Sequence, residues 1–231
     1  AVKKVFVDLY NQEIIYKDKR LVNWDPKLLT AISDLEVEQR DQEGSLWHIK
    51  YPIDEDNFII VATTRPETLL GDSAVAVHPD DSKYKTIIGK FCKLPLVDKN
   101  IPIIADEYAD PEKGSGAVKI TPAHDFNDFE VGKRHQLEFI NIFDEFAKIN
   151  ENAPKRFQGL DRFEARKLIL EELTQLGLLI KEEKQEMVIP YGDRSGVIIE
   201  PWLTDQWFCN AKKLAIDPIK SVREHETNFV P

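Results

Sequence analysis

A succession of short apolar segments between residues 46 and 143 constrains the fold more than any other feature of the chain. The segments are rich in Val, Ile and Phe and are separated by Asp, Asn, Gly and Pro. Such runs, bounded by turn-forming residues, are typical of strands. Many short strands with few long helices between them favour a barrel or a sandwich over a doubly wound sheet. The expected strands cover residues 46–53, 57–63, 73–77, 93–97, 101–105, 116–121 and 138–143.

Helical periodicity is confined to a few segments. Apolar residues recur at helical spacing from residue 1 to about residue 14, and again in residues 125–136. The clearest helix covers residues 161–176 and is followed by Gly177, a residue suited to end a helix. Residues 178–200 return to strand character. The pattern therefore predicts a mainly β protein with peripheral helices and shows no internal repeat.

Two longer stretches share one plan, a short strand that runs into a polar corner and then into a helix. They are residues 61–81, VATTRPETLLGDSAVAVHPDD, and residues 114–135, GSGAVKITPAHDFNDFEVGKRH. Corners of this kind present polar side chains and free backbone N–H groups to a ligand. Because both corners are rich in Thr, Asp, Lys and Arg, we expect them to form two walls of one site.

The first corner has two interpretations. Thr64 followed by Glu67 fits a capping box, and Pro66 stands where the start of a helix tolerates it. In the functional interpretation, the hydroxyl groups of Thr63, Thr64 and Thr68 and the guanidinium of Arg65 lie at the mouth of a pocket. Such groups suit a polar or phosphate-bearing ligand.

The second corner is equally open to interpretation. Asp125 can cap the helix, and Asp128 can occupy its first turn, where carboxylates are favoured. A metal site made of His124, Asp125 and Asp128 has no second ligand cluster to complete it. Alternatively, one carboxylate meets a cationic substrate group. Lys119, on the preceding strand, would then stabilise negative charge developing on a carbonyl oxygen.

Composition narrows the class of protein. The chain has 231 residues, of which 42% are hydrophobic, and a formal net charge of −10. An acidic chain is not expected to bind nucleic acid irrespective of sequence. The two cysteines, Cys92 and Cys209, form no C-x-x-C pair, which argues against a disulfide framework or thiolate metal site. With no long apolar run and no signal-peptide pattern, we expect a cytoplasmic protein that contacts no membrane.

The two stretches resemble the editing domain inserted in valyl-tRNA synthetases, members of the class I aminoacyl-tRNA synthetase family. Leucyl and isoleucyl enzymes carry related domains, but the run KITPAHD and the segment NIFD at residues 141–144 point to the valyl branch. Residues 21–38 and 193–208 also resemble that enzyme where its chain enters and leaves the insertion. Neither the HIGH nor the KMSKS signature is present. The resemblance implies a distorted β-barrel at residues 41–190, between connecting segments 1–40 and 191–231.

The resemblance further implies hydrolysis of the ester in mischarged threonyl-tRNA(Val), with water as the nucleophile and no cofactor. Its partners would be the 3′ end of tRNA(Val) and the remainder of the synthetase. The catalytic residues carried over from the family are Lys119, Asp125 and Asp128, with Asp128 holding the α-ammonium group. The implied substrate-binding residues are Thr63, Thr64, Arg65, Glu67, Thr68, Thr121 and His124.

No metal is implied either. Some relatives bind zinc through cysteine pairs near residues 24–26 and 190–192, where this chain has Asp25, Leu28, Tyr191 and Arg194. Two other functions stay open. One is the editing domain of an isoleucyl-tRNA synthetase, which removes valine, although Arg65 and Lys119 speak against it. The other is a module that binds the tRNA 3′ end without catalysis.

Overall fold

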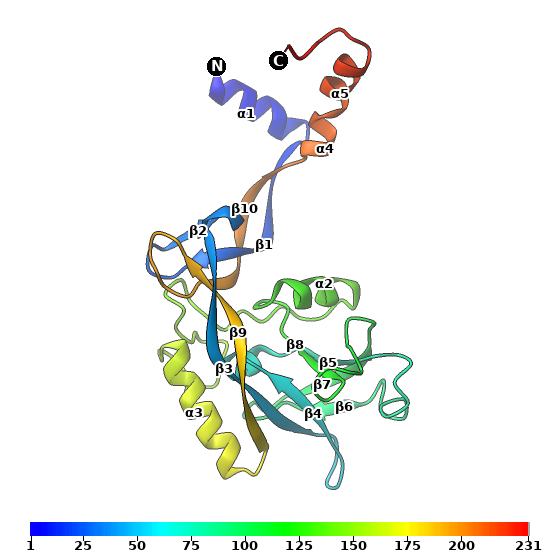
Figure 1. Ribbon diagram of the computed structural model, residues 1–231, viewed down its shortest axis with the longest axis vertical. Helices are drawn as coiled ribbons and strands as arrows, with labels where there is room; N and C mark the ends of the chain where they lie inside the picture. The colour runs from blue at the N-terminus through cyan, green and yellow to red at the C-terminus, as the bar shows by residue number, and fades with distance from the viewer. Residues whose placement is uncertain (231) are drawn as a thin grey trace. The chain divides into compact units, whose positions relative to one another are not determined.

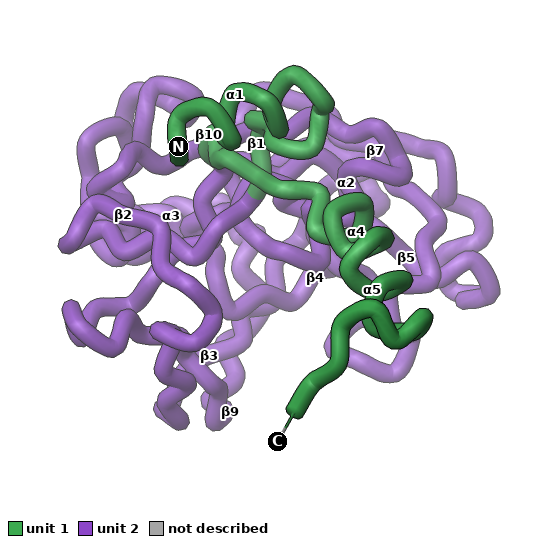
Figure 2. Tube along the Cα trace, turned by 90° about the horizontal axis from the view of Figure 1, so that it is seen from above, with its two compact units in different colours: residues 1–20, 204–231 green, residues 21–203 purple. Residues whose placement is uncertain are grey.

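The computed structural model describes residues 1–230, which form two compact units (Figure 2). One unit joins Ala1–Arg20 to the segment that starts at Thr204, and the other is Leu21–Leu203. Both polar corners lie in the second unit. The expected domain boundaries after residues 40 and 190 stay a prediction.

The unit formed by the two ends of the chain contains helices and parts of two strands. It contains α1 (Val2–Asn11), α4 (Ala211–Leu214) and α5 (Ile216–Arg223), and α1 confirms the helix expected near the start of the chain. Two strands, β1 (Ile15–Asp25) and β10 (Glu200–Cys209), continue from this unit into the other. They are neighbours in a three-stranded sheet of order β10-β1-β2, in which β2 is Thr30–Ile32. Among residues 1–230, no helix combines the length and the apolar character that crossing a membrane requires.

A long antiparallel ribbon lies within the second unit (Figure 1). It pairs β3 (Val37–Pro52) with β9 (Leu179–Gly192) from the Val37–Gly192 pair to the Ile49–Leu179 pair, with a register shift after His48. The other edge of β3 pairs antiparallel with β4 (Phe58–Thr63). In β4 the side chains of Ile59, Val61 and Thr63 are buried and their neighbours less so, as expected for a strand with one face on the core.

The second sheet of this unit has the order β6-β7-β5-β8. Its strands are β5 (Ala74–Val77), β6 (Phe91–Lys93), β7 (Asn100–Ala105) and β8 (Ala117–Ile120). The pair β5–β7 is parallel, and β5–β8 and β6–β7 are antiparallel. β5 is buried on both faces: its valines pack in the main core, whereas Ala74 and Ala76 face a smaller cluster with Ile120 and Val131.

Helices complete the unit. A short 3₁₀ helix, η2 (Pro66–Gly71), follows the first corner, and α2 (Phe126–Arg134) follows the second. The longest helix, α3 (Arg162–Gln175), packs against η2 and β9, and Gly177 follows it with a φ of 66°. Another 3₁₀ turn, η1 (Asp34–Glu36), precedes β3.

The predicted fold class, mainly β with peripheral helices, is confirmed. The described residues form open sheets rather than a continuously hydrogen-bonded barrel. Three expected strands differ from the structure. The strand expected at residues 46–53 is β3, which begins earlier, at Val37. The strand expected at residues 93–97 is β6, which lies earlier at Phe91–Lys93. Residues 138–143 form no strand and contribute only an isolated bridge from Phe143 to Ile149.

Candidate functional site

The two polar corners meet at one cavity of about 210 Å³. β4 delivers the first corner and β8 the second, and these strands lie next to each other, with the Ser115 hydroxyl donating to the carbonyl oxygen of Ile60. All the site residues predicted from the sequence line this cavity except Glu67. The lining residues are Leu46, Ala62, Thr63, Thr64, Arg65, Thr68, Tyr108, Val118, Lys119, Thr121, His124, Asp125 and Asp128.

The first corner is not built as a capping box. The N-cap position of η2 is Arg65, and its side chain makes no capping hydrogen bond. The Thr63 hydroxyl instead accepts from the backbone N–H of Arg65 at 3.0 Å. The side chain of Glu67, which a capping box would direct to the helix start, is buried and accepts two hydrogen bonds from Arg166 at 2.7 and 2.8 Å. The capping interpretation of Thr64 and Glu67 is therefore wrong.

Arg65 is held by acidic partners on two sides. Its guanidinium pairs with Glu67 and Glu200, and it donates to the backbone carbonyl of His124 at 3.0 Å. Burial lowers the pKa of Arg65, but the two carboxylates outweigh burial and raise it overall. Burial likewise raises the pKa of Glu67, and Arg166 and Arg65 outweigh that effect and lower it. Arg65 therefore links the two corners to each other and to the start of β10.

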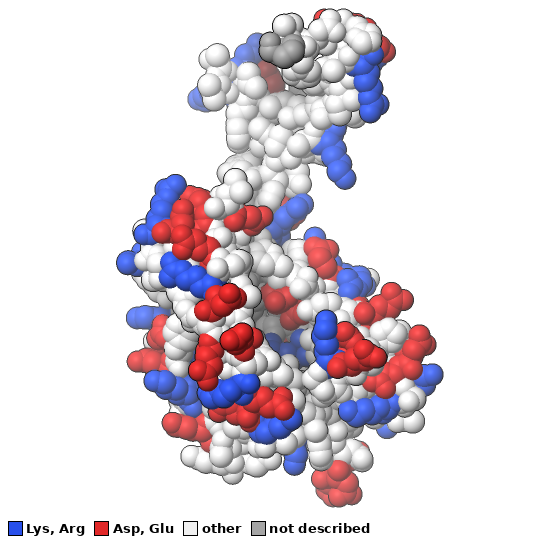
Figure 3. Space-filling model, in the orientation of Figure 1, with Lys and Arg blue, Asp and Glu red and all other residues white. Residues whose placement is uncertain are grey.

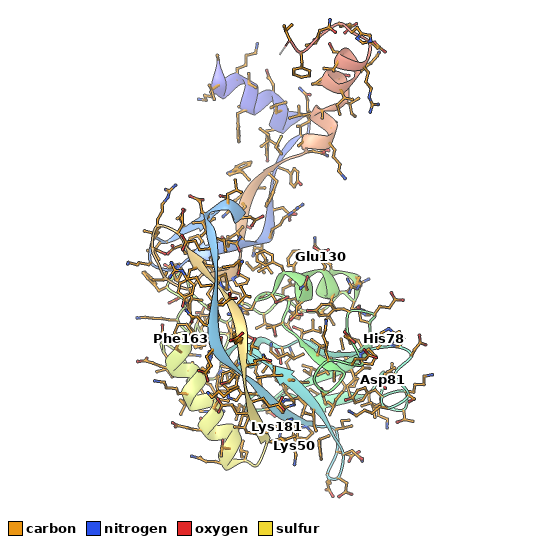
Figure 4. All side chains as sticks on the ribbon, viewed as in Figure 1. Lys50, His78, Asp81, Glu130, Phe163 and Lys181 are labelled. Carbon is orange, nitrogen blue, oxygen red and sulfur yellow. The ribbon has the colours of Figure 1, made fainter. Side chains whose placement is uncertain are left out.

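Arg65 and Glu67 also line a second cavity, next to the first. This second cavity, of about 490 Å³, shares Thr64, Arg65 and Asp125 with the smaller one. Arg166 contributes to that second cavity from α3, together with Phe163, which Figure 4 labels near the start of that helix. Glu67 is thus the one predicted substrate-binding residue that the structure places outside the smaller cavity.

The second corner is fixed by Asp125, as predicted. Its carboxylate accepts from the backbone N–H groups of Asn127 and Asp128, at 2.8 and 3.1 Å, and so caps α2. Asp128 lies in the first turn of the helix and is 5% exposed. Its carboxylate accepts from the backbone N–H of Thr121 at 2.8 Å.

Asp128 has the electrostatic character of a functional carboxyl group. Burial, followed by the neighbouring charge of Asp125, raises its pKa to about 7, while Lys119 acts in the opposite direction. A group that titrates near neutral pH can exchange a proton with a substrate or water. When ionised, the same group can pair with an ammonium ion. Its location in a polar cavity is typical of active sites.

His124 supports the corner from inside. Its ring is buried, and its Nε2 accepts from the backbone N–H of Ile142 at 2.9 Å, which assigns the proton of the neutral ring to Nδ1. The ring also contacts Phe143 edge to face, with 4.8 Å between the ring centroids. Burial, with Arg65 and Lys119 nearby, lowers the pKa of His124 well below its usual value. The ring is therefore neutral and mainly holds the loop at residues 140–143.

Lys119 lies at the centre of a buried polar network. Its ammonium group donates to Thr68 at 2.9 Å, to Asp72 at 3.1 Å and to the hydroxyl of Thr121. Asp72 also accepts from Thr121 and Tyr51, each at 2.6 Å. Burial raises the pKa of Asp72, and Lys119 is the main opposing influence. The position of Lys119 beside the second corner agrees with its predicted place on the strand.

Four residues with a clear part in this arrangement were not predicted from the sequence. Asp72 and Tyr51 lie behind the cavity, Tyr108 lines it, and Glu200 binds Arg65. Asp72 lies within the stretch at residues 61–81, seven residues after Arg65, and that stretch was the only signal that could have found it. Tyr51 and Glu200 come from distant segments and carry no local pattern.

No metal centre is apparent in the part of the chain that the structure describes, since it has no group of three or more His, Cys, Asp or Glu side chains placed to hold an ion. The Nε2 atom of His124 accepts from a backbone N–H, and Asp125 uses its carboxylate as a helix cap. The metal interpretation of the second corner therefore gains no support. The prediction that the chain needs neither metal nor cofactor stays a prediction.

Comparison with known proteins identifies the family. A family model described as tRNA synthetases class I (I, L, M and V) matches residues 1–231. The chain belongs to this family. Among its relatives in the class I tRNA synthetase family is the valine–tRNA ligase of Rhodopseudomonas palustris (strain ATCC BAA-98 / CGA009). It is 58% identical over 254 residues, which cover 100% of this chain and 26% of that protein.

A second class I relative, the valine–tRNA ligase of Pelagibacter ubique (strain HTCC1062), is 59% identical over 232 residues, which cover 100% of this chain and 26% of the relative. The chain thus spans about a quarter of the length of the curated relatives it matches. Among solved structures, the agnB2 LeuRS–tRNA–LeuAMS ternary complex of Agrobacterium radiobacter K84 matches with a TM-score of 0.46 and 17% identity. That match covers 86% of this chain and 32% of the LeuRS chain. The resemblance to the valyl branch is confirmed by the sequence relatives alone.

Proposed function

We propose that this chain is the editing domain of a valyl-tRNA synthetase and hydrolyses the ester of threonyl-tRNA(Val). The observation that carries the proposal is the cavity itself. It gathers hydroxyl groups from both corners around Asp128, a buried carboxyl group whose pKa is raised to about 7. The relatives named as valine–tRNA ligases support the valyl branch.

The chemical need for such a site follows from the likeness of valine and threonine. They have nearly the same shape, and an apolar pocket built for valine rejects threonine only about a hundredfold, a value established for valyl-tRNA synthetases as a class. A polar pocket reverses the preference because threonine can use its hydroxyl there. Valine leaves a buried polar partner unpaired, at a cost of about 1–3 kcal/mol.

The size of the cavity supports a small ligand group. At about 210 Å³ it is below the usual range of about 300–1,000 Å³ for pockets that hold drug-sized ligands. We therefore assign it to the aminoacyl group and the ester, rather than to the whole terminal adenosine. Thr63 and Thr64 line the cavity at the first corner, and Thr68 and Thr121 line it next to each other, since both accept from Lys119.

We assign roles to the three predicted catalytic residues from their surroundings. Asp128, in its ionised form, binds the α-ammonium group of the substrate. Asp125 holds α2 in place through one carboxylate oxygen and lines the cavity, where it orients the attacking water. The positive charge of Lys119 lies in the cavity wall and favours negative charge as it develops on the ester carbonyl.

The reaction is a hydrolysis with water as the nucleophile. Water adds to the ester carbonyl carbon, and the bond to the ribose oxygen then breaks, which leaves threonine and tRNA with a free ribose hydroxyl. The proton lost by water passes to the ribose oxygen. No side chain of the cavity forms a covalent bond in this scheme. Arg65 and His124 act on the walls rather than on the ester, because Arg65 binds Glu67 and Glu200, and the Nε2 atom of His124 accepts from the backbone N–H of Ile142.

Two alternatives lead to different measurements. Removal of valine as part of an isoleucyl-tRNA synthetase would require an apolar cavity, whereas the walls here carry four threonine side chains, Thr63, Thr64, Thr68 and Thr121. A module that only binds the tRNA 3′ end would hold the aminoacyl group without hydrolysing its ester. Both alternatives are decided by the rates of ester hydrolysis.

The test measures hydrolysis of threonyl-tRNA(Val), valyl-tRNA(Val) and valyl-tRNA(Ile) by this chain. Asp128→Asn removes the charge and keeps the shape of the side chain. Glu130→Gln is the matched control, because Glu130 is exposed on the same helix and Figure 4 labels it on α2. We expect preferential hydrolysis of the threonyl ester, loss of at least about a hundredfold in Asp128→Asn, and no loss in the control.

Each outcome has a distinct meaning. Preferential hydrolysis of valyl-tRNA(Ile) would assign the chain to the isoleucyl branch. If no ester is hydrolysed but a non-hydrolysable threonyl amide of adenosine binds, and Asp128→Asn weakens that binding, the chain is a binding module. If the amide does not bind either, the assignment of the cavity to an aminoacyl group fails.

The proposed partners are the 3′ end of tRNA(Val) and the remainder of a valyl-tRNA synthetase. Acidic and basic side chains are interspersed on the face shown in Figure 3, and the formal net charge is −10. We therefore expect the chain alone to bind tRNA weakly, with most of the affinity supplied by the synthetase body. A tight, salt-sensitive complex between tRNA and this chain would contradict that expectation.

A further inference from the structure

Behind the candidate cavity, Tyr51 and Asp72 form a completely buried pair; both are 0% exposed. The Tyr51 hydroxyl donates to one oxygen of the Asp72 carboxylate at 2.6 Å. The other oxygen of Asp72 accepts from Lys119 at 3.1 Å and from the hydroxyl of Thr121 at 2.6 Å. Lys119 and Thr121 line the cavity, whereas Tyr51 and Asp72 are not among its lining residues. Asp72 therefore acts on a ligand only through its neighbours.

The protons of Lys119 are all engaged. An ammonium group has three protons and no acceptor. Lys119 directs them to Asp72, to the Thr68 hydroxyl oxygen at 2.9 Å and to the hydroxyl oxygen of Thr121. Two of these three acceptors are hydroxyl groups in the cavity wall. Lys119 thereby forces each of these hydroxyl oxygens to accept one hydrogen bond from inside the protein.

The hydroxyl protons are engaged as well. Thr121 donates its proton to Asp72, and Thr68 donates its proton to the backbone carbonyl of Arg65 at 3.0 Å. A hydroxyl group has one proton and two lone pairs. Each hydroxyl has given its proton and used one lone pair on Lys119, so what remains is one lone pair. The threonine wall, formed by Thr68 and Thr121, can therefore only accept hydrogen bonds from a ligand.

We propose that Asp72, anchored by Tyr51, is a specificity-determining positioning residue that fixes the threonine wall as a hydrogen-bond acceptor. This inference rests on the proposed function and deepens it, because it names the group that the wall selects. A substrate side chain with a donor, such as the hydroxyl of threonine, satisfies the remaining lone pair. A methyl group in the same place, as in valine, excludes water from that lone pair and cannot donate a hydrogen bond to it.

Because Asp72 accepts the Thr121 proton and binds Lys119, it is the residue that leaves the threonine wall able only to accept hydrogen bonds. If its carboxylate is replaced by an amide, the group can no longer accept from Tyr51, Lys119 and Thr121 at once, because one of its two ends becomes a donor. Even when the amide oxygen faces Lys119 and Thr121, it is a neutral acceptor and weaker than the carboxylate, so the Thr121 hydroxyl can turn its proton toward the cavity. A wall that can either donate or accept no longer distinguishes a substrate hydroxyl by its proton.

A purely structural role for Asp72 predicts a different result. If Asp72 only balanced the buried charge of Lys119, its loss would reduce the folded fraction of the protein. Hydrolysis of threonyl and valyl esters would then fall by the same factor. The proposal predicts instead that the ratio of the two rates changes in protein that is folded.

The experiment compares kcat/KM for threonyl-tRNA(Val) and valyl-tRNA(Val) in the wild type, Asp72→Asn and Tyr51→Phe. Tyr84→Phe is the matched control, because its buried hydroxyl donates to the carbonyl of Ser115 and contacts no residue of the threonine wall. We expect Asp72→Asn to lower the threonine-to-valine ratio by about tenfold to a hundredfold, the effect of one unpaired buried group. Tyr51→Phe should lower it by about threefold to tenfold, and Tyr84→Phe should leave it unchanged.

A folded Asp72→Asn or Tyr51→Phe protein with the wild-type ratio overturns the inference. If Asp72→Asn does not fold, Tyr51→Phe decides, because it deletes one hydroxyl and creates no buried charge. A second measurement does not depend on hydrolysis. The ¹⁵N-NMR signal of the Lys119 ammonium group should exchange slowly with water in the wild type and faster in Tyr51→Phe.

The two measurements separate this inference from the proposed function. If the wild type hydrolyses neither ester while the Lys119 signal is protected as described, the proposed function fails and the arrangement of the wall stands. If the wild type prefers threonine while its Lys119 signal exchanges freely with water, the proposed function stands and the inference is overturned.

Discussion

The carboxylate of Asp128 accepts a hydrogen bond from the backbone N–H of Thr121 at 2.8 Å, which joins the first turn of α2 to the end of β8. This bond fixes the carboxyl group against the wall that faces the first corner. It also places the group where burial and Asp125 raise its pKa to about 7. The stability of the protein should therefore report on this single group.

We expect the stability of Asp128→Asn, relative to the wild type, to increase with pH between about pH 4 and pH 8. The folded protein holds the Asp128 proton up to a pKa of about 7, whereas an unfolded chain releases it near 3.9. The stabilisation from this proton is complete below about pH 4 and is lost as the pH rises through 7, by up to about 4 kcal/mol. Asparagine does not titrate and avoids that loss.

Urea unfolding at pH 5 and pH 8 measures this effect. Glu130→Gln, an exposed change on the same helix, should follow the pH dependence of the wild type. Parallel curves for Asp128→Asn and the wild type would show that the carboxyl group does not hold its proton in the folded state.

Asp125 combines two roles that one pair of variants can separate. Asp125→Ala removes the cap of α2 and should destabilise the protein by about 0.5–2 kcal/mol. Asp125→Asn keeps an acceptor at the cap and should stay within about 0.5 kcal/mol of the wild type. If the charge of Asp125 orients water, Asp125→Asn is stable but hydrolyses the threonyl ester slowly. Thermal unfolding and ester hydrolysis on the same samples test both halves, and full activity of Asp125→Asn would limit this residue to the cap.

Glu200 should be among the most sensitive residues of the unit Leu21–Leu203. It pairs with Arg65, and one of its oxygens lies 3.1 Å from the guanidinium of Arg162. Glu200→Gln leaves buried positive charge without its partner and should cost about 3–5 kcal/mol. The comparison is Glu138→Gln, which loses an exposed pair with Lys99 and should cost no more than about 1 kcal/mol. Chemical denaturation of both variants measures the difference, and equal costs would argue against the buried network.

Gly132 is required by the close packing of α2 on the second corner. A Cβ atom at this position would lie 2.7 Å from the Cβ and Cγ atoms of Pro122. Gly132→Ala gains about 1 kcal/mol of helix propensity and loses about 1–3 kcal/mol to overpacking, so we expect a net loss of stability. Lys133→Ala, on the exposed side of the helix, serves as the control. A rise in the melting temperature of Gly132→Ala would contradict this expectation and show that Pro122 can move to make room for the added methyl group.

The strands that were predictable from the sequence are those with strong local patterns. The segments expected at 57–63, 73–77, 101–105 and 116–121 all agree with observed strands to within one or two residues. The helix at 161–176 was also predictable, because Asp161 caps it and Gly177 ends it. Apolar character alone does not indicate which of its residues are buried, since Leu176, at its end, is 61% exposed.

The segment at 138–143 shows why an apolar run is not sufficient for a strand. Its backbone is satisfied by side chains from elsewhere: Ser73 donates to the carbonyl of Glu138, and His124 accepts from the N–H of Ile142. Once these groups are paired, a strand ladder is no longer required there. No pattern within the segment itself could indicate this.

The residues that line the candidate site were predictable from the sequence, but the hydrogen bonds between them were not. Two strand-to-helix corners were enough to indicate that most of the lining residues lie together. The burial of Glu67 was not visible, because its partner Arg166 is 99 residues further along the chain. Asp72 was missed for a related reason. A buried acid is recognised by the donors around it, and two of these, Tyr51 and Lys119, lie 21 and 47 residues away.

The register of the β3–β9 ribbon has a consequence for the order in which the chain acquires its structure. The ribbon joins residues 37–49 to residues 179–192. β3 therefore cannot pair with β9 until almost the entire unit has been synthesised. Until then, β3 has only β4 as a neighbour among the strands, on its other edge. Contacts this far apart in sequence form slowly. We expect the polar corners and α2 to assemble first on the nascent chain, with zipping of the ribbon as the last and rate-limiting step.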